Sequence, residues 1–328
     1  MDKKKLLINK INEFDKNLNG MIFTNITGED LKFGNNNNNL DSLYQIGSSS
    51  KMFTSLSIFL LQERGLLSIN NPIGDYLKED HKKLLFIDDF DYSTVTIKSI
   101  LNHTSGLGEH LNSGDDEKLL EEVAKKNKVF SLTDIIHMCK VNKVQPFHAP
   151  NTVIQYSNLG YILLGKIVEF ISNVSYKDFI RENIFKPLNM NDSLFISDNS
   201  HDSRILNGGY NGKFAAMTPS LAQSAGEIVS SLEDMKKFLV GLWDGKIVSE
   251  KTLDIILESL ENNTLKADRT FGYGFYKEKN FIGHAGQTFG FLTKAFYDIK
   301  KKQFIIISFN DALASKEMLS LGEILYKK

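Results

Sequence analysis

The alternation of hydrophobic and polar residues changes along the chain, and each change predicts a different kind of element. Segments with the composition and alternation of strands form two pairs, at residues 21–24 and 30–33 and at residues 292–298 and 303–310. Apolar residues at helical spacing predict helices at residues 49–64, 158–171, 232–243 and about 314–326. The strand pairs lie near opposite ends of the chain, which indicates a sheet that both ends build together.

This element order predicts an α+β fold with two lobes. Residues 1–64 and 216–328 would form an α/β sheet domain, in which an antiparallel sheet is flanked by helices. Residues 65–215 would form an inserted, mostly helical lobe. The length of 328 residues agrees with one large domain or with two lobes.

Composition and charge exclude several classes of partner. The chain has 39 Lys and Arg against 40 Asp and Glu, whereas nucleic-acid binding needs a net basic face. No run approaches the roughly 18–20 apolar residues of a membrane span, and the N-terminus lacks the apolar stretch of about 7–15 residues in a secretory signal. We therefore expect a cytoplasmic protein that binds neither nucleic acid nor membranes, while its oligomeric state stays open.

Neither a metal nor a cofactor is expected from the sequence. The single cysteine, Cys139, precludes an intrachain disulfide and argues against a cysteine-built zinc site. The seven histidines are scattered without metal-ligand spacing, and no nucleotide-binding motif occurs. Cys139 follows the apolar run 135–138, so we interpret it as a buried residue without a catalytic role.

Ser48 and Lys51, three residues apart at the start of the predicted helix 49–64, are the first candidate catalytic residues. Residues at this spacing share a helix face, so the hydroxyl and the amine can meet. A serine hydroxyl becomes a good nucleophile when a neighbour takes its proton, and a lysine can do so when burial or nearby cations lower its pKa. Serine is also a common N-cap, so the pair alone admits a purely structural interpretation.

Tyr156 and Asn158, at the start of the predicted helix 158–171, are the second candidate group. A tyrosine whose pKa is lowered by a nearby lysine can carry a proton. Asparagine has both a donor and an acceptor, which suit it to hold a carbonyl or to orient Lys51. The structural alternative is that Asn158 or Ser157 caps the helix and Tyr156 packs at its base.

His284, Gly286 and Gln287 form the third group, in a glycine-rich segment that precedes the predicted strand 292–298. Glycines allow a substrate backbone to approach a strand edge closely. His284 could pair with a substrate carboxylate or position a bound group. Taken alone, the segment is explained more simply as a turn with a surface histidine.

Together the three groups resemble motifs of the serine β-lactamase and penicillin-binding protein superfamily, in its branch of class C β-lactamases, D,D-carboxypeptidases and family VIII esterases. Ser48 and Lys51 match its Ser-x-x-Lys motif, and Tyr156 and Asn158 match its Tyr-x-Asn motif. His284 begins a His-x-Gly motif where other members have Lys-Thr-Gly. Further matches, in the family's order, lie at residues 101–107, 184–190, 224–234 and 271–275.

The resemblance implies a β-lactamase/transpeptidase-like fold with the active site in a cleft between two lobes. It implies that Ser48 attacks a carbonyl, that Lys51 and Tyr156 carry the proton, and that Asn158 helps to hold the acyl group. The family's oxyanion hole corresponds to the backbone N–H groups of Ser48 and Gln287.

The histidine in the third motif bears on the substrate. A lysine there would be charged, whereas a histidine with an ordinary pKa of about 6.5 is mostly neutral at pH 7. Arg269 could supply the missing charge if it reaches the cleft. We therefore expect a serine hydrolase that acts on small-molecule esters or amides through an acyl-serine. The alternatives are a β-lactamase or D-alanyl-D-alanine carboxypeptidase, and a penicillin sensor or scaffold that does not hydrolyse its ligand.

Overall fold

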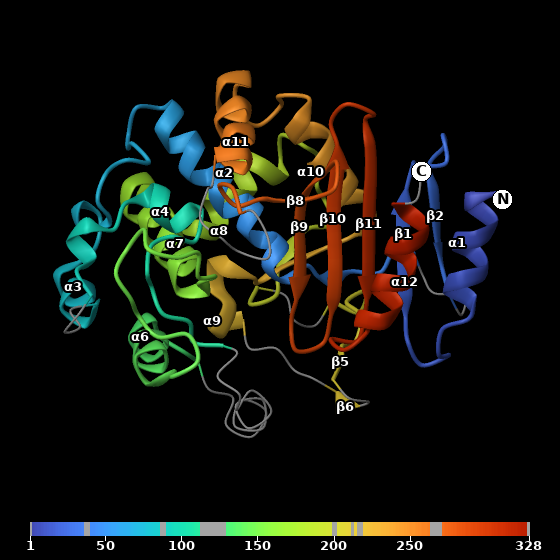
Figure 1. The fold of residues 1–328 in the computed structure, drawn as a ribbon, viewed down its shortest axis with the longest axis horizontal. Coiled ribbons are helices and arrows are strands. Elements are labelled where there is room, and N and C mark those ends of the chain that lie inside the picture. Colours follow the sequence, from blue (N-terminus) through green and yellow to red (C-terminus); the bar gives the residue numbers. More distant parts are fainter. Residues whose placement is uncertain are drawn as a thin grey trace.

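The molecule is built around a six-stranded sheet, shown in Figure 1. The computed structural model describes residues 2–35, 40–85, 90–111, 129–198, 202–210, 213–214, 219–262 and 271–326. The strand order is β2-β1-β11-β10-β9-β8, and all neighbouring strands are antiparallel. The strands are β1 (Gly20–Thr24), β2 (Leu31–Gly34), β8 (Tyr276–Glu278), β9 (Phe281–Gln287), β10 (Leu292–Asp298) and β11 (Gln303–Phe309). Both ends of the chain contribute to the sheet because β1 pairs with β11.

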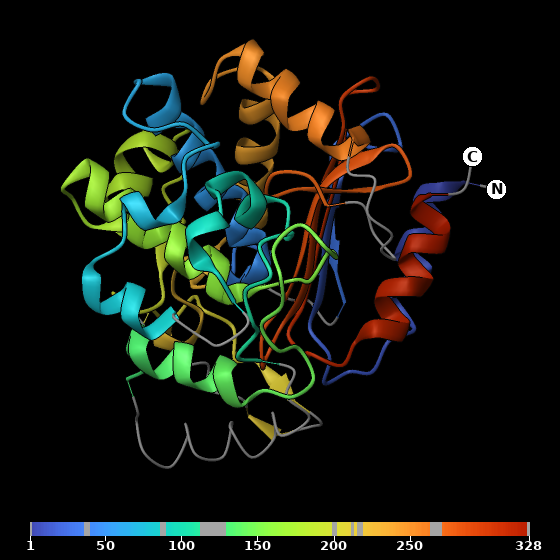
Figure 2. The same cartoon turned by 60° about the vertical axis from the view of Figure 1, so that its left-hand side comes forward.

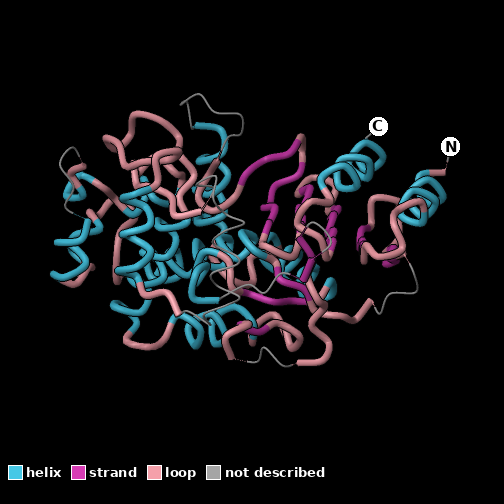
Figure 3. Tube along the Cα trace, turned by 90° about the horizontal axis from the view of Figure 1, so that it is seen from below, coloured by secondary structure: helices cyan, strands magenta, loops and turns pink. Residues whose placement is uncertain are grey.

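The first and last helices, α1 (Lys3–Asn12) and α12 (Ser315–Leu325), cover one face of this sheet. They lie side by side in Figure 3, and Figure 2 shows them on the face turned away from the other helices. Alternate side chains of β11 point to opposite faces, so Ile305 and Ile307 pack under these two helices. Ile306 points the other way, into the larger core.

The other face of the sheet packs against α2 (Ser50–Glu63) and α10 (Leu232–Trp243). Helix α2 is buried on all sides from its first residue to Leu61 because α7 and β9 both contact it. The start of this central helix is therefore held between the sheet and the helical part of the molecule.

The remaining elements are mostly short. The other helices are α3 (Glu79–Leu85), α4 (Ile97–Leu101), α6 (Leu132–Val141), α7 (Asn158–Ser172), α8 (Tyr176–Ile180), α9 (Pro219–Ala222) and α11 (Glu250–Asn262). Single helical turns are η1 (Gly47–Ser49), η2 (Ile73–Asp75), η3 (Tyr92–Thr94), η4 (Arg181–Phe185) and η5 (Gln223–Ala225). Two small sheets contain β3 (Tyr44–Gln45), β7 (Ile228–Ser230) and β4 (Leu194–Phe195), and β5 (Gly209–Tyr210) and β6 (Lys213–Phe214).

The structure confirms the predicted fold class, an antiparallel sheet flanked by helices. The helix predicted at residues 232–243 coincides with α10. The segment around His284 precedes the strand β10, as predicted, but it is itself part of a strand, β9, whose glycines disguise its strand character. Helix α11 was not predicted.

The division into two lobes stays a prediction, and its boundary at residues 215 and 216 lies outside the described residues, as does Arg269. Within the described residues, no helix combines the length and the apolar character that crossing a membrane requires.

Candidate active site

Ser48 lies in the helical turn η1, which leads directly into α2. This turn packs against β9, where Ser49 Oγ donates a hydrogen bond of 3.1 Å to the carbonyl oxygen of His284. Gly47 has a φ of 52°, and a Cβ at this position would lie only 3.1 Å from Gln287 N. Glycine at this position therefore lets the half-buried Ser48 sit beside the end of β9.

Lys51 is fully buried one turn further along α2. Its Nζ donates hydrogen bonds to Ser48 Oγ at 3.1 Å, to Asn158 Oδ1 at 2.6 Å and to the carbonyl oxygen of Ala225 at 2.9 Å. Burial lowers the pKa of Lys51 from 10.5 to about 7, although the negative charge of Glu109 acts in the opposite direction. Near neutral pH a large share of these amines is therefore uncharged and able to accept the Ser48 proton.

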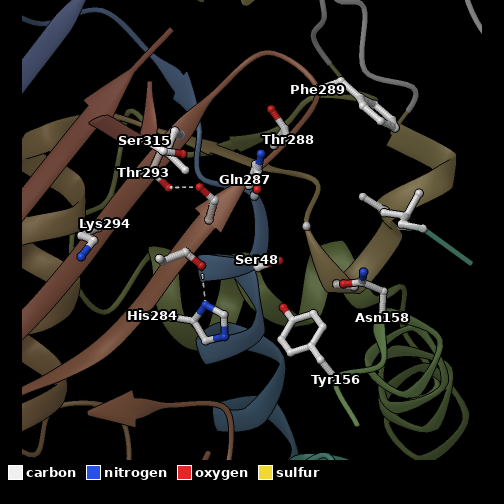
Figure 4. Close-up of a pocket in the computed structure, with 18 of the residues that line it drawn as sticks. Ser48, Tyr156, Asn158, His284, Gln287, Thr288, Phe289, Thr293, Lys294 and Ser315 are labelled. Carbon is white, nitrogen blue, oxygen red and sulfur yellow. Dashed lines mark hydrogen bonds between the residues drawn. The ribbon is translucent and has the colours of Figure 1, made fainter. Parts of the chain in front are cut away.

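The Tyr156 ring lies next to the same amine. Lys51 Nζ is 4.8 Å from the centre of this ring, and the ring of His103 packs on it at 4.3 Å between centres. Figure 4 shows the phenol oxygen on the side of the ring that faces Ser48. His103 is buried, its pKa is held well below the usual value mainly by desolvation, and its Nδ1 accepts a hydrogen bond from Ser157 N–H. His103 thus orders the segment that carries Tyr156.

Asn158 is the first residue of α7, and Ser157 caps this helix by accepting a hydrogen bond from Gly160 N–H. The structural and the functional interpretations therefore both apply. Ser157 caps the helix, and the side chain of Asn158 accepts a hydrogen bond from Lys51 Nζ. The backbone N–H of Asn158 donates a 2.6 Å hydrogen bond to the buried carboxylate of Glu109.

The third predicted group lies on β9 and forms one wall of the site. His284 is only 3% exposed, so the interpretation as a surface histidine on a turn was wrong. Its Nδ1 donates a hydrogen bond to the Ala285 carbonyl oxygen, drawn in Figure 4. A Cβ at Gly286 would collide with the carbonyl oxygen of Ile46 at 1.9 Å, so this strand and the turn before α2 touch backbone to backbone. The Gln287 side chain is exposed to the cleft and donates to Ala312 O at 3.0 Å.

A cavity of about 810 Å³ connects these residues. Six of the predicted site residues line it, namely Ser48, Tyr156, Asn158, His284, Gly286 and Gln287. Lys51 is enclosed behind Ser48, within hydrogen-bond distance of its hydroxyl. The fold therefore brings together all seven residues that the sequence predicted, from α2, from the start of α7 and from β9.

Two groups at the site were not recognised in the sequence, the carbonyl oxygen of Ala225 and the carboxylate of Glu109. Ala225 belongs to the motif match at residues 224–234, but nothing in that match indicates that its carbonyl accepts from Lys51. Glu109 follows the motif at residues 101–107 by two positions. A lone glutamate near a glycine is an ordinary loop residue, and only its complete burial distinguishes it.

Cys139 is buried, and burial raises the pKa of its thiol. A thiol held in its neutral form is a poor nucleophile, which agrees with its interpretation as a residue without a catalytic role. Among the residues that the structure describes, no three His, Cys, Asp or Glu side chains gather closely enough to hold a metal ion.

Comparison with known proteins identifies the family that this fold and these motifs define. The family model described as Beta-lactamase matches residues 9–321. The chain therefore belongs to the beta-lactamase family.

Penicillin-binding proteins are similar to the chain in sequence, and an amidohydrolase is similar to it in fold. Penicillin-binding protein 4* of Bacillus subtilis is 26% identical over 291 residues, which are 81% of this chain but only 60% of that protein. The D-stereospecific amidohydrolase from Streptomyces sp. has the same fold, with a TM-score of 0.82 at 18% identity over 97% of this chain and 96% of that chain. The octameric penicillin-binding protein homologue from Pyrococcus abyssi gives a TM-score of 0.75 at 25% identity, over 97% of this chain and 77% of that one.

Proposed function

We propose that this protein is a serine hydrolase that cleaves small, uncharged esters or amides through an acyl intermediate on Ser48. The observation that carries the proposal is the buried amine of Lys51, 3.1 Å from Ser48 Oγ, with its pKa lowered to about 7. An amine with this pKa can act as a general base at neutral pH, which an ordinary exposed lysine cannot do.

The reaction has two steps that share the same groups. Ser48 Oγ attacks the carbonyl carbon of the substrate, and its proton passes to Lys51 Nζ. The proton then goes to the leaving alcohol or amine, with the Tyr156 phenol as the carrier on the cavity side. Water attacks the acyl-serine in the second step and releases the acid, which regenerates the Ser48 hydroxyl.

The oxyanion of each tetrahedral intermediate is stabilised by the backbone N–H groups of Ser48 and Gln287. The close packing of Gly47 against Gln287 N supports this pairing, because it puts the Gln287 amide beside the residue that precedes Ser48. The loss of one such donor typically costs about 10²–10³ in rate. Asn158 holds the acyl group in place.

The charges around the cavity favour an uncharged substrate. Among the described residues that line the cavity, one is a lysine, Lys294, and one is a carboxylate, Glu278. The two form an ion pair with 2.6 Å between Lys294 Nζ and Glu278 Oε2. Of the lining residues that the structure describes, His284 is then the group left to pair with a substrate carboxylate near Ser48. Another part of the wall is apolar and carries the exposed side chains of Leu313 and Leu319, which suits an apolar substituent on the substrate.

A β-lactamase or D-alanyl-D-alanine carboxypeptidase is the second candidate, and the part of β9 that extends beyond β8 supports it. Within the part of the chain that the structure describes, β8 pairs with β9 from Phe281 to Gly283, and residues 285–287 line the cavity beyond the end of β8. A peptide can add to such an edge as a further strand. A penicillin sensor or scaffold is the third candidate, in which Ser48 is acylated but not released, or is not acylated at all.

Intact-protein mass spectrometry tests the proposal and separates the candidates. The protein is exposed to p-nitrophenyl esters of short acids, amino-acid amides of both configurations, a chromogenic cephalosporin and a peptide ending in D-Ala-D-Ala. The mass of the adduct identifies the acyl group, and its decay gives the rate of hydrolysis. We expect turnover of the esters, with loss of both adduct and turnover in Ser48→Ala.

Ser57→Ala is the matched control, because Ser57 is a buried serine of the same helix that donates to Phe53 O and does not line the cavity. Full ester turnover by Ser48→Ala would refute the assignment of the nucleophile. Rapid hydrolysis of the cephalosporin or release of D-Ala, without ester turnover, would favour the second candidate. A stable penicillin adduct would favour the sensor, and no adduct with any probe would favour the scaffold.

A further inference from the structure

Glu109 is a completely buried carboxylate that has no part in the steps above. It follows the segment that packs His103 against Tyr156, and it does not line the cavity. Its Oε1 accepts hydrogen bonds from the backbone N–H groups of His110 at 2.8 Å and Leu111 at 2.9 Å. A buried charge is costly unless it is fully bonded, so this carboxylate needs a structural or functional reason.

The other carboxylate oxygen points to the catalytic groups. Oε2 of Glu109 accepts the 2.6 Å hydrogen bond from Asn158 N–H, at the N-terminus of α7, where the helix dipole favours a negative charge. The side chain of the same Asn158 accepts from Lys51 Nζ at 2.6 Å. Glu109 is thus connected to the candidate general base through Asn158. The backbone N–H of Asn158 bonds to Glu109, and its side-chain amide oxygen bonds to Lys51.

Glu109 is also the negative charge that acts on Lys51. Its charge raises the pKa of Lys51 against the larger lowering by burial. Several other titratable side chains face Lys51 or its stretch of α2 from the elements packed around it. These are His103, Tyr156, Tyr161, Tyr176, Tyr273, whose ring packs on Phe59 of α2, and His284.

Four of these neighbours add no charge near neutral pH. Desolvation raises the pKa values of Tyr161, Tyr176 and Tyr273 and lowers that of His103, so these four groups are neutral. His110 faces Glu109 directly, with Nδ1 3.2 Å from Oε1 and Nε2 2.9 Å from the Leu221 carbonyl oxygen.

We propose that Glu109 is a positioning residue of the Ser48 site: its carboxylate fixes Asn158 at the start of α7, and through Asn158 it holds the Lys51 amine and sets its basicity. This inference rests on the proposed function. Glutamine cannot replace the carboxylate, because its amide has an acceptor at one end only and would present its NH₂ either to Asn158 N–H or to the two loop N–H groups. Aspartate keeps the charge but is one methylene too short to span both sets of donors.

The first measurement is independent of activity. The Lys51 signal of protein labelled with ¹³C at lysine Cε is titrated by NMR and assigned by its absence in Lys51→Met. We expect a pKa of about 7 in the unchanged protein. In Glu109→Gln the value should fall by about one pH unit, because a stabilising negative charge is removed. In Glu109→Asp the value should stay near that of the unchanged protein.

The second measurement is the pH profile of Ser48 acylation by a p-nitrophenyl ester, followed by the burst of nitrophenol. In Glu109→Gln the acidic limb should move to lower pH with the Lys51 pKa, while the plateau rate falls about 10- to 100-fold because Asn158 and Lys51 lose their geometry. Glu109→Asp should show the lower plateau without the displaced limb. Glu227→Gln is the matched control, since Glu227 is a buried carboxyl that accepts from Ser197 Oγ and does not line the cavity.

The outcomes separate the two proposals. An unchanged Lys51 titration and an unchanged acylation rate in Glu109→Gln would overturn the role of Glu109 while leaving the serine hydrolase intact. A displaced Lys51 titration in a protein that no ester acylates would support the electrostatic role and refute the proposed function. If Glu109→Gln does not fold, a wild-type acylation rate in Glu109→Asp would by itself overturn the positioning role.

Discussion

Two lysines lie around one cavity, and their surroundings are opposite. The amine of Lys51 is completely buried and donates to three neutral oxygens, from a hydroxyl, an amide and a backbone carbonyl. The side chain of Lys294 is 18% exposed, and its amine donates to both carboxylate oxygens of Glu278, at 2.9 and 2.6 Å. Tyr326 donates a further hydrogen bond to the same carboxylate.

The difference shows how one residue type serves two purposes. A charged amine is stabilised by water or by a carboxylate in direct contact, and Lys294 has the second of these. Lys51 is buried, and its hydrogen bonds go to a hydroxyl, an amide and a backbone carbonyl, so burial lowers its pKa to about 7 although the charge of Glu109 acts in the opposite direction. Distance to a carboxylate thus separates a candidate base from a structural ion pair.

Removal of the Lys51 amine should have the largest effect. Lys51→Met should lower the rate of Ser48 acylation about 10²- to 10⁴-fold, because the serine hydroxyl loses its general base. Lys51→Arg should be equally slow, since a guanidinium stays charged and cannot take the proton. Burst kinetics with a p-nitrophenyl ester measure both. Near-normal acylation in Lys51→Arg would contradict the role of the neutral amine.

Asn158→Asp should give Lys51 a carboxylate in direct contact, as Lys294 has. The new carboxylate would replace the amide oxygen now 2.6 Å from Nζ and should raise the pKa of Lys51 by about 1–3. Acylation at pH 7 should then fall about 10- to 100-fold and recover as the pH is raised, since deprotonation merely requires a higher pH. Asn158→Ala is the control, because it removes the acceptor without adding charge. An identical pH profile for the two variants would argue against the electrostatic explanation.

Local spacing is what made this site predictable. Ser48 in the turn η1 and Lys51 in α2 are three residues apart in one continuous helical segment, so their contact follows from helix geometry alone, and Asn158 follows a capping serine at a clear helix start. The strands at residues 292–298 and 303–309 were equally visible, because they combine β-branched and aromatic residues with a short turn. The order of the motifs then indicated that the groups meet.

Contacts between distant segments were not predictable in the same way. The bonds of Lys51 to Ala225 O and, through Asn158, to Glu109 join parts of the chain that only the folded structure brings together. β9 was missed because Gly283 and Gly286 weaken its strand pattern, while the fold requires them for close backbone packing. The groups that contact the candidate base therefore came from tertiary structure, and the candidate base itself from the sequence.

Lys51 should also make the free energy of unfolding depend on pH. Its pKa is about 7 in the folded protein against 10.5 for an unperturbed lysine, so between these values the unfolded chain binds a proton that the folded protein lacks. The free energy of unfolding should therefore rise with pH, by about 2 kcal/mol between pH 7 and pH 9 from this group. Lys51→Met should lack this rise. Urea unfolding at the two pH values measures it, and an equal rise in both proteins would mean that Lys51 is not the group responsible.

The smallest effect is expected at the ion pair. Lys294→Met should leave Glu278 bonded to Tyr326 and cost about 1 kcal/mol of unfolding free energy, since the pair is partly exposed. For a neutral ester kcat/KM should change by less than about tenfold, because Lys294 donates to Glu278 and not to Ser48. Urea unfolding and steady-state kinetics measure the two quantities. A loss of acylation comparable to that of Lys51→Met would show that Lys294 contacts the substrate, and the neutral-substrate proposal would then have to give way to a charged one.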